Sequence, residues 1–395
     1  MPTESPVAQR TQSSASKPKT EFNTRVTGLT CFACGQHHDH RQAQTVCRAC
    51  GMPLRVDYAL DKSTMARTAP AAGPSSLWRY RNVLPFSTGE VTLTEGWTPL
   101  IAVDESTWIK DEARNPTGSF KARGMSAAVS AAVAVGAEAL CAPSAGNAAG
   151  ALAAYGAAAH LPVVVAVPDD TPRAFISECR LYGAEVHLVP GTIADAGKWL
   201  RANGPPGAFD VSTLREPYRI EGKKTMAYEL YEQLDGDLPD VIVYPTGGGT
   251  GLVGMWKAFH EMRAIGWLEA DAPLPRLVSV QAEGCAPVVR GFETRAARTE
   301  PWENAHTGAF GLRVPSPLGG FLCLQALRET QGTAIAVEEA TIAPATTALA
   351  SQTGVDVCPE GGAAWAAVET LRDNGFIRPD DRVVVFNTGT GLKYR

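Results

Sequence analysis

The stretch DVIVYPTGGGTGLVGMWKAFHEM, residues 240–262, decides the fold class of this chain of 395 residues. It begins as an apolar, β-branched run, continues through three successive glycines, and ends with the apolar spacing of a helix. The same order recurs where the strand-like LPVVVAVP (161–168) precedes the helical TPRAFISECRLYG (171–183). This alternation predicts an α/β protein with parallel sheets that helices cover on both faces.

The glycine loop itself, Gly247–Gly251, indicates a phosphate-binding site. Consecutive glycines let backbone N–H groups turn toward one point, and the following helix N-terminus adds positive potential. The loop lacks the lysine of a nucleotide P-loop, and its spacing differs from that of a dinucleotide fingerprint. The alternative is a tight turn, but three successive glycines are costly in folding entropy.

A second segment, NPTGSFKARG (115–124), surrounds Lys121 with small and turn-forming residues. A partly desolvated lysine loses its proton more readily, as Schiff-base chemistry requires. The alternative is a solvent-exposed lysine at a helix start, and this segment alone does not decide between them.

The set of motifs carries more information than any one of them. NPTGSFKARG, PSAGNAAGALAAYG, YRIEGKKT, PTGGGTG and NTGTGLKY follow one another in an order and spacing that resembles threonine synthases. These enzymes belong to the tryptophan-synthase-β-like group, fold type II, of pyridoxal-phosphate enzymes. The resemblance covers about residues 77–395 and implies two domains with parallel or mixed sheets.

The resemblance also implies roles for individual residues. Lys121 resembles the lysine that binds the cofactor covalently and shuttles protons, and Arg219 resembles an arginine that binds the substrate phosphate. Thr388 matches the hydroxyl residue near the pyridine nitrogen. The remaining implied positions are Asn147 at the cofactor's 3-hydroxyl, Ser144, Ala145, Gly146 and Asn147 at the substrate carboxylate, and Gly247, Gly248, Gly249, Thr250 and Gly251 at the cofactor phosphate.

Two departures from the family pattern leave the substrate open. The phosphate loop reads GGGTG rather than an asparagine-containing form, and Thr213 and Leu214 replace an Asn-Ser pair that contacts the substrate phosphate. Because Leu214 cannot donate a hydrogen bond, we expect looser binding of that group. The leading prediction is γ-elimination of phosphate from O-phosphohomoserine with addition of water to give L-threonine. The alternatives are β-elimination or β-replacement on threonine, serine or a phosphorylated hydroxy-amino acid, and a non-catalytic zinc-ribbon binding protein.

Four cysteines near the start, Cys31, Cys34, Cys47 and Cys50, form two CxxC pairs separated by twelve residues. This spacing is typical of a zinc ribbon and predicts one structural Zn²⁺. His37, His38 and His40 are more simply interpreted as exposed polar loop residues than as zinc ligands, since four thiolates already complete the site.

Composition and segment character give the remaining expectations. The 36 basic and 41 acidic residues leave a net charge of −5, which does not favour a nucleic-acid partner. No apolar run has the length of a membrane helix, and the five other cysteines are scattered singly, as in a reducing cytoplasm. We expect a cytoplasmic homodimer. The predicted parts are a disordered tail (1–26), a zinc-ribbon-like module (27–60), a large domain (61–106 and 215–395) and a small domain (107–214).

Overall fold

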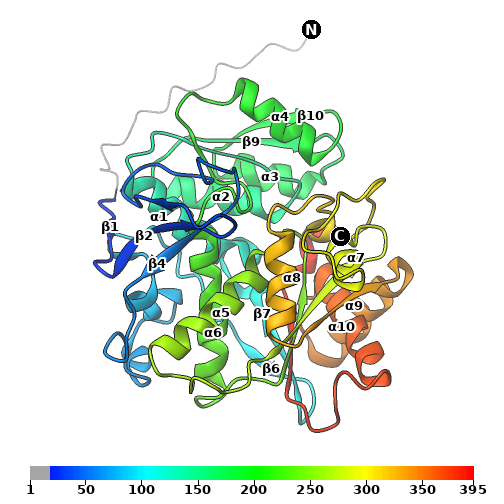
Figure 1. Cartoon of the computed structure of the whole chain (residues 1–395). Helices are drawn as coiled ribbons and strands as arrows, with labels where there is room; N and C mark the ends of the chain where they lie inside the picture. Colours follow the sequence, from blue (N-terminus) through cyan, green and yellow to red (C-terminus); the bar gives the residue numbers. More distant parts are fainter. Residues whose placement is uncertain (1–17) are drawn as a thin grey trace.

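The larger of two α/β sheets forms the base of the molecule in the computed structural model, which describes residues 18–395 (Figure 1). Its six strands follow the order β14-β13-β12-β15-β7-β6. Neighbouring strands are parallel except for the antiparallel pair β6 and β7. The strands are β6 (Leu100–Ala102), β7 (Thr107–Asp111), β12 (Val241–Pro245), β13 (Arg276–Ala282), β14 (Thr333–Val337) and β15 (Val383–Asn387).

The smaller sheet has four strands in the order β10-β9-β8-β11, and every neighbouring pair is parallel. Its strands are β8 (Leu140–Pro143), β9 (Val163–Pro168), β10 (Glu185–Val189) and β11 (Phe209–Asp210). β9 is buried along its whole length, as its unbroken apolar sequence predicts for a central parallel strand. The α/β fold class is therefore confirmed.

In the described part of the chain, ten α-helices cover the sheets, and α1 and α5 pack on one another between them (Figure 1). α5 also packs along α6, and α9 packs along α10. The helices are α1 (Lys121–Ala134), α2 (Asn147–Ala158), α3 (Arg173–Leu181), α4 (Ile193–Asn203), α5 (Tyr218–Gln233), α6 (Thr250–Ala264), α7 (Pro287–Glu293), α8 (Gly320–Glu329), α9 (Glu339–Thr353) and α10 (Pro359–Asp373).

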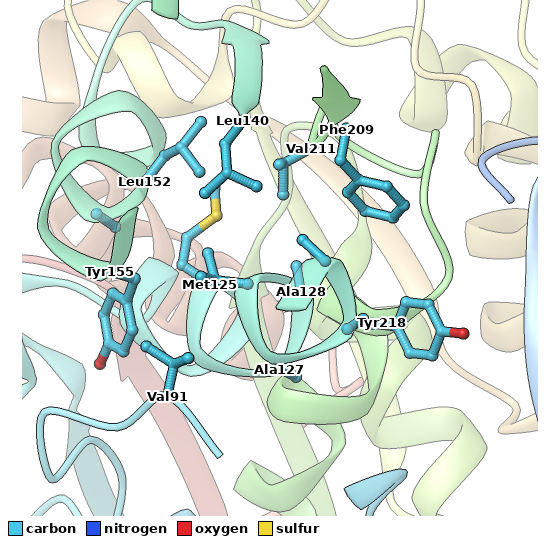
Figure 2. Packing of buried hydrophobic residues seen from close by; sticks show 14 of the residues in the cluster. Val91, Met125, Ala127, Ala128, Leu140, Leu152, Tyr155, Phe209, Val211 and Tyr218 are labelled. Carbon is cyan, nitrogen blue, oxygen red and sulfur yellow. The ribbon is translucent and has the colours of Figure 1, made fainter. Parts of the chain in front are cut away.

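The core beside the smaller sheet shows how alanine-rich helices bury their surface. Figure 2 shows Met125 of α1 directed toward Leu140 of β8 and Leu152 of α2, and all three side chains are buried. Small residues such as Ala127 and Ala128 let the helix backbones approach closely, and the few large side chains fill the remaining space. This close packing fixes the start of α1, where Lys121 lies.

A small antiparallel sheet forms the N-terminal module, in the order β3-β2-β4. Its strands are β2 (Val26–Cys31), β3 (His37–His38) and β4 (Leu54–Tyr58). Leu29, Leu54 and Val56 belong to the same buried cluster as α1 and α2. The module therefore shares the core of the main body.

The start of the fold differs from the predicted disordered tail (1–26), of which residues 1–17 lie outside the described part of the chain. β1 (Glu21–Phe22) pairs antiparallel with β5 (Phe86–Thr88). The ring of Phe22 lies 4.9 Å from the ring of His40 and 5.2 Å from that of Phe86. One aromatic side chain in a polar segment thus secures the chain to the body.

The predicted start of the small domain at residue 107 also differs from the strand pairing. β7 pairs with β15 in the larger sheet, so residues 107–111 belong with the larger sheet. The pairing partner lies over 270 residues away, and sequence pattern carries no information on it. Among the described residues, none of the helices has the length and apolarity needed to cross a membrane.

Candidate active site

One cavity of about 1170 Å³ contains every residue that we predicted for cofactor and substrate binding. The set that lines it is Lys121, Ser144, Ala145, Gly146, Asn147, Arg219, Gly247, Gly248, Gly249, Thr250, Gly251 and Thr388. They come from the loops that follow β8, β12 and β15 and from α1, α2, α5 and α6. Loops that follow parallel strands converge at one edge of a sheet, so this convergence follows from the topology.

Lys121 is the first residue of α1, and it lies in the cavity wall. The preceding loop is fixed by the backbone N–H of Phe120, which donates to the carbonyl oxygen of Thr388 at 3.1 Å. Burial and the positive charge of Arg219 together lower the pKa of Lys121 to about 7, against the opposing effect of Glu360. A lysine in this state provides a free amine near neutral pH, which covalent binding of an aldehyde cofactor requires.

The glycine loop has the close approaches that a phosphate cradle needs. Gly249 caps α6 with a left-handed φ of +79°, and a Cβ there would lie 2.2 Å from Cys323 Sγ. A Cβ on Gly247 would lie 2.2 Å from the carbonyl oxygen of Gly311. The loop therefore accepts only glycine at these positions and presents the N-terminus of the 15-residue α6 to the cavity. A phosphate group fits this donor set.

Asn147 is held by the C-terminal segment of the chain. The ammonium of Lys393 donates to Asn147 Oδ1 at 3.0 Å and forms an ion pair with Glu178 at 2.7 Å. Because the amide oxygen is occupied, Asn147 presents its nitrogen as a donor. Such a donor suits a phenolate oxygen such as the cofactor's 3-hydroxyl. The sequence analysis used the GLKY segment as a family marker and missed this contact.

Thr388 and Glu360 lie at the same wall of the cavity as Lys121. Cys358 Sγ lies 3.8 Å from Thr388 Oγ1. Glu360 Oε1 accepts hydrogen bonds from the backbone N–H of Gly311 at 2.7 Å and from the hydroxyl of Tyr394 at 2.8 Å. The sequence analysis did not select Glu360. The PEGG segment that contains Glu360 follows no apolar strand, so it lacks the strand-end position that marks the other loops of the site.

Arg219 lies in the first turn of α5, where it is 2% exposed and lines the cavity. Its Nη1 donates to the carbonyl oxygen of Val211 at 2.9 Å and to Thr213 Oγ1 at 3.2 Å. Its Nε has no acceptor among residues 18–395. Burial lowers the pKa of this guanidinium, and the nearby carboxylate of Glu216 raises it. Arg219 therefore lines the cavity with part of its hydrogen-bonding capacity unused.

Leu214 does not have the place that the sequence comparison gave it. Its side chain is 1% exposed in a hydrophobic cluster, and a Cβ on Gly319 would lie 2.0 Å from its Cδ1. The cavity is instead lined by Ser212, Thr213 and Arg215 from the same segment. Loss of a polar contact at Leu214 is therefore no evidence for looser binding, because this position faces the core.

The four N-terminal cysteines come together as the zinc-ribbon prediction requires. Their Sγ atoms all lie within 4.8 Å of one another. The distance is 3.5 Å between Cys31 and Cys50 and 3.6 Å between Cys34 and Cys47. Four thiolates at Zn–S bonds of about 2.3 Å have edges of about 3.8 Å, so the cluster fits a tetrahedral Zn²⁺. No histidine belongs to this cluster within residues 18–395, and the Nδ1 of His37 is hydrogen-bonded to Thr30 Oγ1 at 2.8 Å.

Comparison with known proteins agrees with this geometry. The model of the family "pyridoxal-phosphate dependent enzyme" matches residues 91–389. The threonine synthase of Methanosarcina acetivorans is 34% identical over 376 residues, which cover 92% of both chains. That of Methanocaldococcus jannaschii is 31% identical over 376 residues, with 92% of each chain covered.

Solved structures show the same fold. A serine racemase from maize has a TM-score of 0.62 and 22% identity, with 74% of this chain and 88% of that chain covered. An L-serine ammonia-lyase from Rhizomucor miehei has a TM-score of 0.63 and 22% identity, with 75% and 97% covered. The chain belongs to the pyridoxal-phosphate-dependent enzyme family.

Proposed function

We propose that this pyridoxal-phosphate-dependent enzyme converts O-phosphohomoserine and water into L-threonine and phosphate. Its similarity to threonine synthases supports the reaction class. The observation that carries the substrate assignment is Arg219, a buried guanidinium in the cavity wall that has no ion pair within the described chain. An uncompensated buried charge is costly, and a phosphate on the substrate would neutralise it.

The residues of the cavity would hold the cofactor at three points. Lys121 would bind it covalently, Asn147 would donate to its ring hydroxyl, and the Gly247–Gly251 loop would bind its phosphate. When bound, the cofactor supplies an electron-withdrawing ring next to the substrate α-carbon. Thr388 would face the ring nitrogen, and a neutral hydroxyl does not enforce protonation there.

The substrate would then lie between the two sheets. The Ser144–Asn147 loop would bind its carboxylate, while Arg219 and Thr213 would bind its side-chain phosphate. With its pKa of about 7, Lys121 suits a group that accepts a proton from a substrate carbon and returns it later. Phosphate would leave as the Cγ–O bond breaks, and a water oxygen would bond to Cβ.

A parallel assay tests this assignment. The purified enzyme is incubated with O-phosphohomoserine, threonine, serine and phosphoserine, and the release of phosphate, ammonia and keto acid is measured. We expect phosphate release and threonine formation from O-phosphohomoserine alone. Ready deamination of threonine without turnover of any phosphorylated amino acid would replace the proposal with the β-elimination alternative.

The variant Arg219→Ala sharpens the assay. A hydrogen bond to a charged group contributes about 1.5–3 kcal/mol, so KM for O-phosphohomoserine should rise about 10- to 100-fold. Any residual activity on serine or threonine should keep its KM, because these substrates carry no side-chain anion. An equal rise for all substrates would show that Arg219 acts on the fold of the cavity.

We also propose that Cys31, Cys34, Cys47 and Cys50 bind one structural Zn²⁺. Metal analysis of protein purified without chelator should give about one zinc per chain. Cys34→Ser should lower that content, while Cys285→Ser, at a buried cysteine outside the cluster, should not. Two disulfides in place of the metal would contradict the proposal. The homodimer, the cytoplasmic location and the other domain boundaries stay predictions.

A further inference from the structure

Lys223 is a buried cation that the proposed reaction does not use. It lies on α5, it is completely buried, and no ion pair to it exists among residues 18–395. Its next neighbour, Lys224, forms ion pairs with Glu221 at 2.6 Å and with Glu261 at 2.9 Å. A buried ammonium without a counter-charge is rare enough to require an explanation.

Within residues 18–395, Lys223 makes one side-chain hydrogen bond, and it leads to the residue that follows the glycines of the loop. Its Nζ donates to Thr250 Oγ1 at 2.5 Å. Thr250 is the first residue of α6, follows Gly249 directly, and lines the cavity. In its ammonium form Lys223 has donors and no acceptor, so the hydroxyl oxygen of Thr250 accepts this hydrogen bond. The hydroxyl hydrogen of Thr250 is then available to a different partner.

The surroundings of Lys223 carry an excess of positive charge. Burial lowers the pKa of Lys223 well below its usual value, and the charges of Arg219 and Lys121 lower it further, with Glu216 as the opposing carboxylate. The Nζ also lies 4.6 Å from the centroid of the Phe120 ring. An anion bound at the glycine loop would provide the missing negative charge.

We propose that Lys223 is a positioning residue for the phosphate group of the cofactor. It fixes the Thr250 hydroxyl as a hydrogen-bond donor toward the phosphate and supplies positive charge behind the loop. The inference rests on the proposed assignment of Gly247–Gly251 to the cofactor phosphate, and it does not depend on the amino-acid substrate.

The test compares two cofactor forms in the absence of substrate. Apoenzyme of the wild type and of Lys223→Met is titrated with pyridoxal phosphate and with pyridoxal, which lacks the phosphate, and binding is followed by visible absorbance. Lys223→Met removes the charge behind the loop and the contact that orients the Thr250 hydroxyl. Binding of pyridoxal phosphate should therefore weaken about 10- to 100-fold. The affinity for pyridoxal should stay unchanged. Equal weakening of both compounds, or of neither, would overturn the proposal.

The melting temperature of the apoenzyme separates this role from a structural one. Because Lys223→Met removes an uncompensated buried charge, the apo variant should melt at the same temperature as the wild type or higher. Lys224→Met is the matched control, since it breaks an ion pair. It should melt lower and bind the two cofactor forms in the wild-type ratio. A destabilised Lys223→Met apoenzyme would assign Lys223 to the fold.

Thr250→Val provides a second route to the same answer. It removes the hydroxyl through which Lys223 acts, so it should weaken binding of pyridoxal phosphate and spare pyridoxal. In the double variant, Lys223→Met should cause a smaller further loss of affinity for pyridoxal phosphate than it causes in the wild type, because the two residues share one contact. Full additivity would show that Lys223 does not act through Thr250. These measurements use no amino acid, so they hold whether or not O-phosphohomoserine is the substrate.

Discussion

Two groups of charged side chains, both buried or half-buried, meet at the packed helices α1 and α5, and they differ in one respect. In the paired group, Arg123 of α1 forms ion pairs with Glu112 and Glu229, and Lys110 forms one with Glu229 at 2.8 Å. In the unpaired group, Lys121, Lys223 and Arg219 have no carboxylate partner within residues 18–395. All four side chains of the paired group are fully buried.

Buried charges that are paired within the chain stabilise the fold, whereas unpaired cations at the cavity are available to a ligand. Where both signs of charge are provided by the sequence, the cluster is satisfied by itself and joins β7, α1 and α5. Where the cations form no ion pair and outnumber the nearby carboxylates of Glu216 and Glu360, a bound anion would supply the remaining negative charge. Lys121 and Arg123 are two residues apart, which is about 200° around a helix. Their side chains therefore lie on opposite faces of α1, one at the cavity and one at the ion-pair cluster. The expectations below test this distinction in order of decreasing effect.

The largest effect should come from Lys121→Ala. Turnover should be abolished, because the variant lacks both the amine that binds the cofactor and the proton shuttle. The melting temperature of the apoenzyme should not fall, since Lys121 takes part in no ion pair of the described chain. A variant that unfolds would place Lys121 in the structural group and break the comparison.

Arg123→Met should produce the largest loss of stability. It leaves the carboxylates of Glu112 and Glu229 buried with only Lys110 to compensate them, and loss of one partner of a buried pair costs about 3–5 kcal/mol. Urea unfolding of the apoenzyme measures the free energy of unfolding. Arg114→Met is the control. The side chain of Arg114 is 68% exposed in its ion pair with Asp111, so this variant should change the free energy of unfolding by less than about 1 kcal/mol. Equal effects for the two variants would contradict the distinction.

Leu214→Ser tests which residues form the anion end of the cavity. Because Leu214 is buried against Gly319, its truncation should cost about 2–5 kcal/mol in the free energy of unfolding. KM for O-phosphohomoserine should not improve, since the serine hydroxyl would face the core. Urea unfolding and steady-state kinetics measure the two quantities. A lower KM would return Leu214 to the substrate-binding segment.

The smallest effect concerns the protonation of Lys121 in the apoenzyme. With a pKa of about 7 in place of the usual 10.5, its amine is mostly neutral at pH 8 and mostly charged at pH 6. Competitive acetylation followed by mass spectrometry should therefore show reactivity that rises through pH 7 and then levels. Arg219→Ala removes one of the charges that lower this pKa, so the rise should move to higher pH. Exposed Lys62 provides the reference in the same digest, and an unmoved profile would show that Arg219 does not act on Lys121.

Most of the site was predictable because its signals are local. Lys121, Asn147, Thr388 and the glycine loop each lie in a short motif at a strand end or helix start, and parallel topology brings such loops together. Glu360, Lys393 and Lys223 were missed because their roles depend on partners elsewhere in the chain. Leu214 was misplaced for the same reason, since its neighbour Thr213 faces the cavity and nothing local distinguishes the two.

The amino-acid sequence alone was enough to predict the fold class, the pyridoxal-phosphate-dependent family and the residues that line the cavity. Hydrophobic periodicity and the small-residue loops encode these features over stretches of ten to twenty residues. Only the tertiary structure decided which buried charges are compensated. The ion pairs of Arg123 join residues up to 106 positions apart, while the hydrogen bond that Lys223 makes within residues 18–395 is to Thr250, 27 positions away. Whether a buried charge serves the fold or awaits a ligand depends on what lies within a few ångströms of it, because Coulomb and desolvation energies are set by distance in space and by burial.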